Sequence, residues 1–220
     1  MIDYRKEGGV HLAIMTEAGS TICPDWQQHM LNVLDAVEVD CGHGAAFVLT
    51  GCNKFFCNGL NLEVLMQLAP QEMEQFGQRM NEIFSRLLVL PCPTVAAMNG
   101  HAFAAGAFLA LAMDYRLMRE DRGWFCISEV DVGVPISAAM MEMMRGKMPA
   151  TTARDALLTG KRYTADEAIA GGIADGKAPE QQLLVQAMSL AGELATKEPG
   201  IFKVLKQTWF GPMAEALVAS

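Results

Sequence analysis

One glutamate, Glu129, stands in a setting that suits acid–base chemistry. It follows the apolar residues 124–127, which are typical of a short strand, and it precedes a Gly-Val-Pro turn at 133–135. Burial among apolar neighbours disfavours a charged carboxylate and raises its pKa, which makes it a better base near neutral pH. The commoner position of a glutamate is the surface or a helix cap, and we expect Asp131, in the same segment, at a helix start.

Two glycine-containing turns could donate hydrogen bonds to an oxyanion. They span residues 56–62 (Phe-Cys-Asn-Gly-Leu-Asn-Leu) and 99–108, and in each a buried strand ends and the chain enters a helix. Backbone N–H groups at such helix starts are free to bind an anion. If the two strands are neighbours in one parallel sheet, these groups point into one crevice at the carboxyl ends of the strands. Taken singly, each turn is also explained by a plain strand-to-helix connection or by tight helix–sheet packing.

The elements that must position these groups alternate between strands and helices. Continuous apolar runs at 44–50 and 94–98 predict strands buried on both faces, and the periodicity of 71–88 predicts a long helix. Such alternation indicates an α/β fold with a largely parallel sheet. The last third of the chain has a helical pattern almost throughout. We therefore expect an α/β core over residues 1–150 and a C-terminal helical section over residues 151–220.

The composition restricts the function classes. About half of the 220 residues are apolar, which is enough to bury one sizeable core, and the net charge of −8 argues against nucleic acid or an anionic membrane as partner. No apolar run is long enough to cross a membrane. The six cysteines show neither a C-x-x-C pair nor a metal-ligand spacing, so we expect no metal site. The first residues lack the apolar stretch of a signal peptide, and Val218–Ser220 is not a peroxisomal address, so we expect a cytoplasmic location.

These segments, in this order and spacing, resemble the crotonase (enoyl-CoA hydratase/isomerase) superfamily over nearly the whole chain. Further segments that resemble the family are residues 114–116, 164–168 and 171–175. Within the superfamily, the chain is most similar to the plant-type 3,2-enoyl-CoA isomerases, on residues 101–106, 118–123 and 128–133. The resemblance implies a spiral of ββα units, a C-terminal section that covers the site or forms a trimer, and a homotrimer or dimer of trimers. It also implies an acyl-CoA thioester as substrate and no cofactor.

The resemblance assigns a role to each candidate site residue. The backbone N–H groups of Leu60 and Ala105 would form the oxyanion hole for the thioester carbonyl, and Glu129 would be the acid/base. The residues that match the loop along the CoA moiety are Asn58, Asn61 and Leu62. Hydratases of the family carry a second glutamate, and its position in this chain is occupied by Phe108.

The expected reaction moves the double bond of an acyl-CoA from the 3 to the 2 position. Glu129 would remove the C2 proton and return it at C4, while two N–H donors stabilise the dienolate oxygen. A hydratase, or another crotonase-type reaction on an acyl-CoA, is the alternative enzyme. A non-catalytic acyl-CoA-binding or scaffold protein is the alternative of another class, and it would not need an ionisable Glu129.

Overall fold

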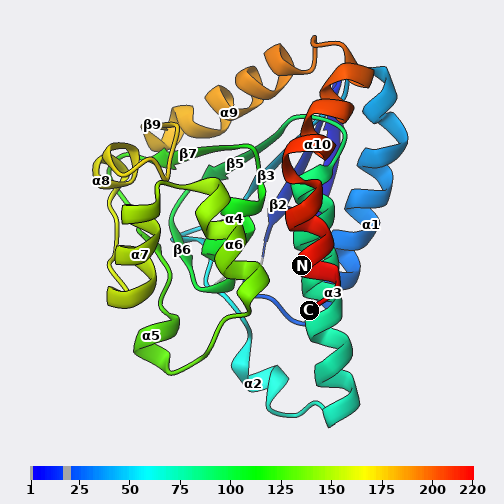
Figure 1. Cartoon of the computed structure of the whole chain (residues 1–220). Coiled ribbons are helices and arrows are strands. Elements are labelled where there is room, and N and C mark those ends of the chain that lie inside the picture. The colour runs from blue at the N-terminus through cyan, green and yellow to red at the C-terminus, as the bar shows by residue number, and fades with distance from the viewer. Residues whose placement is uncertain (1, 17–20) are drawn as a thin grey trace.

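Two β-sheets, enclosed by helices, form the framework of the computed structural model, which describes residues 2–16 and 21–220 (Figure 1). The larger sheet has the order β1-β2-β3-β5-β7-β9 and the smaller sheet the order β4-β6-β8. The larger sheet contains β1 (Ile2–Glu7), β2 (Val10–Met15), β3 (Ala46–Thr50), β5 (Thr94–Met98), β7 (Tyr115–Arg119) and β9 (Gly176–Ala178). The smaller sheet contains β4 (Phe55–Cys57), β6 (His101–Phe103) and β8 (Phe125–Cys126). Between these strands all pairings are parallel except that of β1 with β2.

The chain repeats one connection three times. A strand of the larger sheet leads into a strand of the smaller sheet and then into a helix, as β3-β4-α2, β5-β6-α4 and β7-β8-α5. The helices are α2 (Leu62–Leu65), α4 (Ala105–Ala112) and α5 (Glu129–Val132). The expected α/β spiral of ββα units is thus confirmed. One detail differs: the second turn, residues 99–108, contains a strand of its own, β6, because the chain crosses to the smaller sheet after Asn99 and Gly100. Helix α4 therefore follows β6 rather than the strand at 94–98.

Helices cover both faces of the larger sheet. Alternate residues of β3 belong to two different cores, since Phe47 and Leu49 pack in the main core and Ala46 and Val48 pack in a second one. Helices α1 (Pro24–Asp40) and α3 (Pro70–Val89) contribute to the main core, and α9 (Glu180–Leu194) covers the second. Every residue of α4 is buried, so this helix runs through the centre of the molecule. A short 3₁₀ helix, η1 (Cys41–His43), follows α1.

The last third of the chain is mainly helical but also supplies an edge strand. Its helices are α7 (Ala150–Thr159), α8 (Ala165–Ala170), α9 and α10 (Pro199–Val218), and α6 (Ala138–Lys147) precedes them. Strand β9 pairs with β7, so the section 151–220 completes the larger sheet as well as covering it. Helix α10 packs along α3, and the C-terminus lies beside α3 in Figure 1. No helix of the described residues is long and apolar enough to cross a membrane.

Candidate active site

Leu60, Ala105 and Glu129 follow the carboxyl ends of three neighbouring strands. Strands β4, β6 and β8 are parallel, with β6 in the middle, and each is followed after two or three residues by one of the three. Because the carboxyl ends of parallel strands meet at one edge of a sheet, the fold brings these residues to the same edge. The two glycine turns are therefore neighbours, as the expected crevice requires.

The two turns are packed directly against each other. Gly59 has a φ of +83°, and a Cβ atom on it would lie 3.7 Å from the backbone nitrogen of Ala105 and 3.2 Å from the carbonyl oxygen of Phe103. The same Cβ atom would lie 3.3 Å from the Cβ atom of Ala104. A glycine is needed here for both its backbone conformation and its size, and its small size brings the first turn close to the Ala105 N–H.

Hydrogen bonds hold the first turn on both sides of Leu60. The Ile22 N–H donates to the Gly59 carbonyl at 2.8 Å, and the Asn61 N–H donates to the Ile22 carbonyl at 2.9 Å. Among the described residues, the Leu60 N–H between these two bonds has no acceptor. The Ala105 N–H belongs to the first turn of α4, where helix geometry provides no acceptor either. Both turns thus offer an unused backbone donor.

The second turn begins with a strained residue. Ala104, which precedes α4, has a φ of +50° and a ψ of −122°, a conformation that favours glycine. Its N–H donates to the Cys126 carbonyl at 3.0 Å, and its carbonyl accepts from the N–H groups of Ala107 and Phe108 at 2.8 and 3.1 Å. These bonds hold the backbone in the orientation that starts α4 at the sheet edge.

Glu129 is a buried carboxylate with an unsatisfied oxygen. It is the first residue of α5, and it is only 7% exposed. Its Oε2 atom has no hydrogen-bond partner among the described residues. Burial raises the pKa of the Glu129 carboxyl above its usual value, and a hydrogen bond from its own backbone partly opposes this. The neighbouring Asp131 carboxylate packs instead over Gly160, at the end of α7.

The three residues expected along CoA have different surroundings. Asn58 and Leu62 are exposed beside the first turn. Asn61 is the N-cap of α2: its Oδ1 accepts from the Val64 N–H at 3.2 Å, and its Nδ2 donates to the Thr21 hydroxyl at 3.4 Å. Asn61 therefore holds the turn in place through its side chain, a structural role that the sequence pattern did not reveal.

Exposed apolar side chains cluster on the two short helices that follow β4 and β8. In Figure 1, α2 and α5 lie at the same end of the molecule. The exposed apolar residues on or next to them are Leu62, Val64, Met66, Val130, Val132 and Val134. Val130, Val132 and Val134 alternate along the chain, a pattern typical of a strand rather than of an exposed helix. The sequence therefore did not predict this exposed apolar surface. It offers apolar contact at the end of the molecule where α2 and α5 lie.

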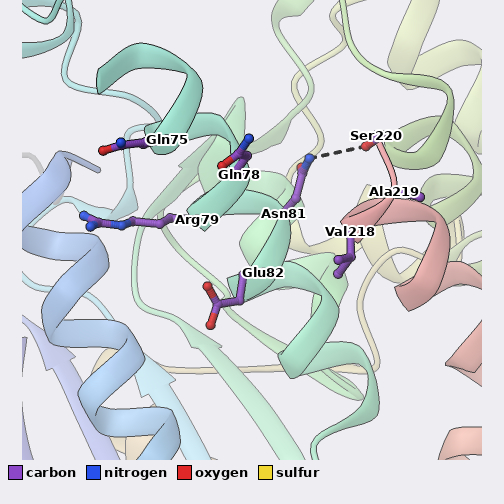
Figure 2. Close-up of a pocket in the computed structure, with 8 residues that line it drawn as sticks. All are labelled: Gln75, Gln78, Arg79, Asn81, Glu82, Val218, Ala219 and Ser220. Atoms are coloured by element: carbon purple, nitrogen blue, oxygen red, sulfur yellow. Dashed lines mark hydrogen bonds between the residues drawn. The ribbon is translucent and has the colours of Figure 1, made fainter. Parts of the chain in front are cut away.

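A cavity of about 580 Å³ lies elsewhere, between α3 and the C-terminal end of α10 (Figure 2). Figure 2 shows Asn81 pointing toward Ser220, and its Nδ2 donates to the Ser220 hydroxyl at 3.3 Å. The lining is mostly polar and includes none of the candidate residues. Residues 2–16 and 21–220 also contain no group of three or more His, Cys, Asp and Glu that could hold a metal ion.

Comparison with known proteins identifies the family of this chain. The family model for enoyl-CoA hydratase/isomerase matches residues 8–219. An Arabidopsis thaliana relative, the peroxisomal enoyl-CoA delta isomerase 2, is 34% identical over 207 residues, which is 90% of this chain and 86% of the relative. A putative enoyl-CoA hydratase of Thermus thermophilus is 33% identical over 90% of this chain and 79% of its own length. The structure of a Mycobacterium tuberculosis enoyl-CoA isomerase superposes with a TM-score of 0.90 at 26% identity, over 99% of this chain and 94% of that one. The chain therefore belongs to the enoyl-CoA hydratase/isomerase family of enzymes.

Proposed function

We propose that this enzyme shifts the double bond of a 3-enoyl-CoA to the 2 position, with Glu129 as its single acid/base. The observation that carries the proposal is the buried Glu129 carboxylate with an unpaired oxygen, at the sheet edge where Leu60 and Ala105 also lie. The Arabidopsis relative that is named an enoyl-CoA delta isomerase supports the same reaction.

In this mechanism the thioester carbonyl makes the C2 proton acidic. The N–H groups of Leu60 and Ala105 would stabilise the oxyanion of the dienolate that forms when Glu129 takes this proton. The protonated Glu129 would then deliver the proton to C4, and the double bond would come to lie between C2 and C3. One carboxyl group suffices, because C2 and C4 are close enough to lie under it in turn. The low polarity around Glu129 strengthens the oxyanion contacts.

The CoA moiety would lie along Asn58 and Leu62, with Asn61 holding the turn, and the acyl chain would contact the apolar side chains of α2 and α5. The carbonyl group itself takes up the developing charge, so the proposed reaction needs no cofactor besides the CoA ester. A homotrimer or dimer of trimers is proposed on the family resemblance. A cytoplasmic location is also proposed, whereas the Arabidopsis relative is peroxisomal by name.

The proposal is tested by replacing Glu129 with Gln, which keeps the shape and removes the base. Turnover of a 3-enoyl-CoA should fall by about two to four powers of ten, while CoA binding measured by calorimetry stays nearly unchanged. Asp131→Asn, in the same helix, is the matched control and should keep most of the activity. Near-normal isomerisation by the Glu129→Gln variant would sink the mechanism.

The second candidate is a hydratase, because the Thermus thermophilus relative is named a putative enoyl-CoA hydratase. Parallel assays on a 3-enoyl-CoA and a 2-enoyl-CoA separate the two reactions. Membership in a family of enzymes argues against the non-catalytic acyl-CoA-binding alternative.

A further inference from the structure

A second cavity, of about 490 Å³, lies between α6, α10 and the start of β7. None of the residues proposed for catalysis lines it. Its charged walls include Asp114, Lys147 and Lys206, and its apolar walls include Leu205, Trp209 and Phe210. The cavity thus combines buried charge with an apolar surface, a combination typical of sites for amphipathic ligands.

Lys206 and Asp114 satisfy each other in this wall. The Lys206 Nζ donates to the Asp114 Oδ2 at 2.7 Å and to the Cys92 carbonyl at 3.2 Å. The same Asp114 oxygen also accepts from the Thr94 N–H and hydroxyl at 2.9 and 3.0 Å. This carboxylate is therefore fully engaged and is not available to a second cation.

Lys147 has no comparable partner. It is the last residue of α6 and only 9% exposed, and among the described residues its Nζ forms neither an ion pair nor a hydrogen bond. Its Nζ instead makes a cation–π contact with the Phe210 ring, whose centroid lies 4.1 Å away. A mostly buried ammonium without an anionic partner is less stable than one in water, and burial lowers the pKa of Lys147 to about 7.

The charges around Lys147 do not cancel its own. Asp114 and Asp175 favour the ammonium form and Arg116 and Lys206 oppose it, so two negative neighbours face two positive ones. In the cavity wall itself, Asp114 is the one carboxylate beside Lys206 and Lys147, so protonation of Lys147 leaves one positive charge there. One negative charge from a ligand would complete the balance.

We propose that this cavity binds a small organic monoanion, a carboxylate with an apolar tail, whose carboxylate pairs with the Lys147 Nζ. The tail would lie against Leu205 and Trp209. In the single chain Trp209 is 76% exposed, which leaves its indole available to an apolar ligand there. This site is independent of the proposed isomerase reaction, because it shares no residue with it.

The pairing makes binding depend on pH. The carboxylate requires the protonated form of Lys147, so the bound ligand raises the pKa of this amine. Above the pKa of free Lys147, near 7, the amine must take up a proton before it can pair. The apparent Kd should therefore rise as the pH increases, by up to about tenfold per pH unit.

Hexanoate is a suitable probe, with titration of the full-length chain followed by tryptophan fluorescence and by calorimetry. We expect saturable binding at pH 6.5 and about tenfold or greater weakening at pH 8.5. Trp209→Phe should abolish the fluorescence change without abolishing the calorimetric signal. Lys147→Met should weaken binding by about tenfold or more, and 1-hexanol, which has the same tail without the charge, should bind wild type and this variant equally.

Lys203→Met is the matched control, since it removes one lysine from the exposed side of α10 and should bind hexanoate like wild type. Thermal denaturation checks the fold of Lys147→Met, which removes a buried unpaired charge and should not destabilise the protein. The proposal is overturned if wild type shows no saturable hexanoate binding, as it would if a second copy of the chain covered the cavity. Equal hexanoate affinity of Lys147→Met and wild type would also overturn it, because the ligand would then bind elsewhere.

Discussion

A Cβ atom on Gly106 would lie only 2.2 Å from the carbonyl oxygen of Cys57. The first turn of α4 therefore rests directly on the end of β4, with no room for a side chain between them. This contact joins the two segments that present the Leu60 and Ala105 N–H groups, so it fixes the spacing of the proposed oxyanion hole.

Gly106→Ala should consequently damage both stability and catalysis. Alanine in a helix is normally favoured over glycine by about 0.5–1 kcal/mol, but here its methyl group must displace backbone atoms. We expect a lower Tm and a lower kcat on a 3-enoyl-CoA, measured by thermal denaturation and by assay. Gly77→Ala is the matched control: it lies within α3 with open space around its Cβ position, and it should raise the Tm. Equal Tm values for the two variants would show that α4 can move away from β4 freely.

Ala104→Gly should stabilise the protein. Ala104 has a φ of +50°, and such a backbone conformation costs a residue with a side chain about 1–3 kcal/mol. Glycine removes this strain but adds about 0.5–1 kcal/mol of unfolded-chain entropy, so the net gain should be about 1 kcal/mol. Denaturant unfolding measures the difference. Ala107→Gly, within the regular part of the same helix, should have the opposite sign, and a loss of stability in both variants would argue against strain at Ala104.

The sequence predicted best those elements that are buried on both sides. The apolar run 94–98 coincides with β5, and the periodic segment 71–88 lies within α3, because full burial or a one-sided apolar face leaves a clear pattern. Strand β1 is a mostly exposed, charged edge strand, and β6 and β9 have three residues each, so their patterns are weak. These strands form because they pair with neighbouring strands in the sheets, and their own residue patterns do not predict them.

The same distinction applies to the site. The residue type and apolar setting of Glu129 could be interpreted from the sequence, and so could the two turns. The close approach of Gly59 to Ala105 depends on the register of β4 and β6, which no local pattern encodes. Lys147 has the ordinary look of a basic residue at a helix C-terminus, and its burial appears only once α10 packs over α6.

The raised pKa of Glu129 predicts a stability difference that depends on pH. Below the ordinary glutamate pKa, the carboxyl is protonated in both the folded and the unfolded state, so wild type and Glu129→Gln should have similar stability. As the pH rises through the raised folded-state pKa, the buried carboxyl must ionise at a cost and wild type loses stability. The Tm of Glu129→Gln should therefore exceed that of wild type by an amount that grows as the pH rises from the ordinary glutamate pKa to the raised folded-state pKa, and that stays constant above it.

In wild type, the kcat/KM for isomerisation should increase with pH over the same window, because the base form of Glu129 is needed. Glu63→Gln removes one exposed carboxylate on α2 and controls for the change in net charge. A pH-independent Tm difference between wild type and Glu129→Gln would contradict burial of an ionisable group at this position.

Hydration of a 2-enoyl-CoA should be slow in this enzyme. Adding water across the double bond requires one group to activate the water and another to protonate C2, and the hydratases that the chain resembles use two glutamates. Phe108 stands at the second position, fully buried in α4, and its ring can neither accept a proton nor hold a water. The other carboxylates on α5 and α2 are differently placed, since Asp131 packs over Gly160 and Glu63 is exposed. A missing general acid or base costs about two to four powers of ten, so hydration should be at least about 100-fold slower than isomerisation of the 3-enoyl substrate.

Loss of the conjugated thioester absorbance measures hydration, and its gain measures isomerisation. Phe108→Leu, which also lacks a carboxylate, should keep this preference, because the preference comes from the absent carboxylate rather than from the ring itself. Comparable rates of the two reactions in wild type would place a second acid or base in the site and would favour the hydratase.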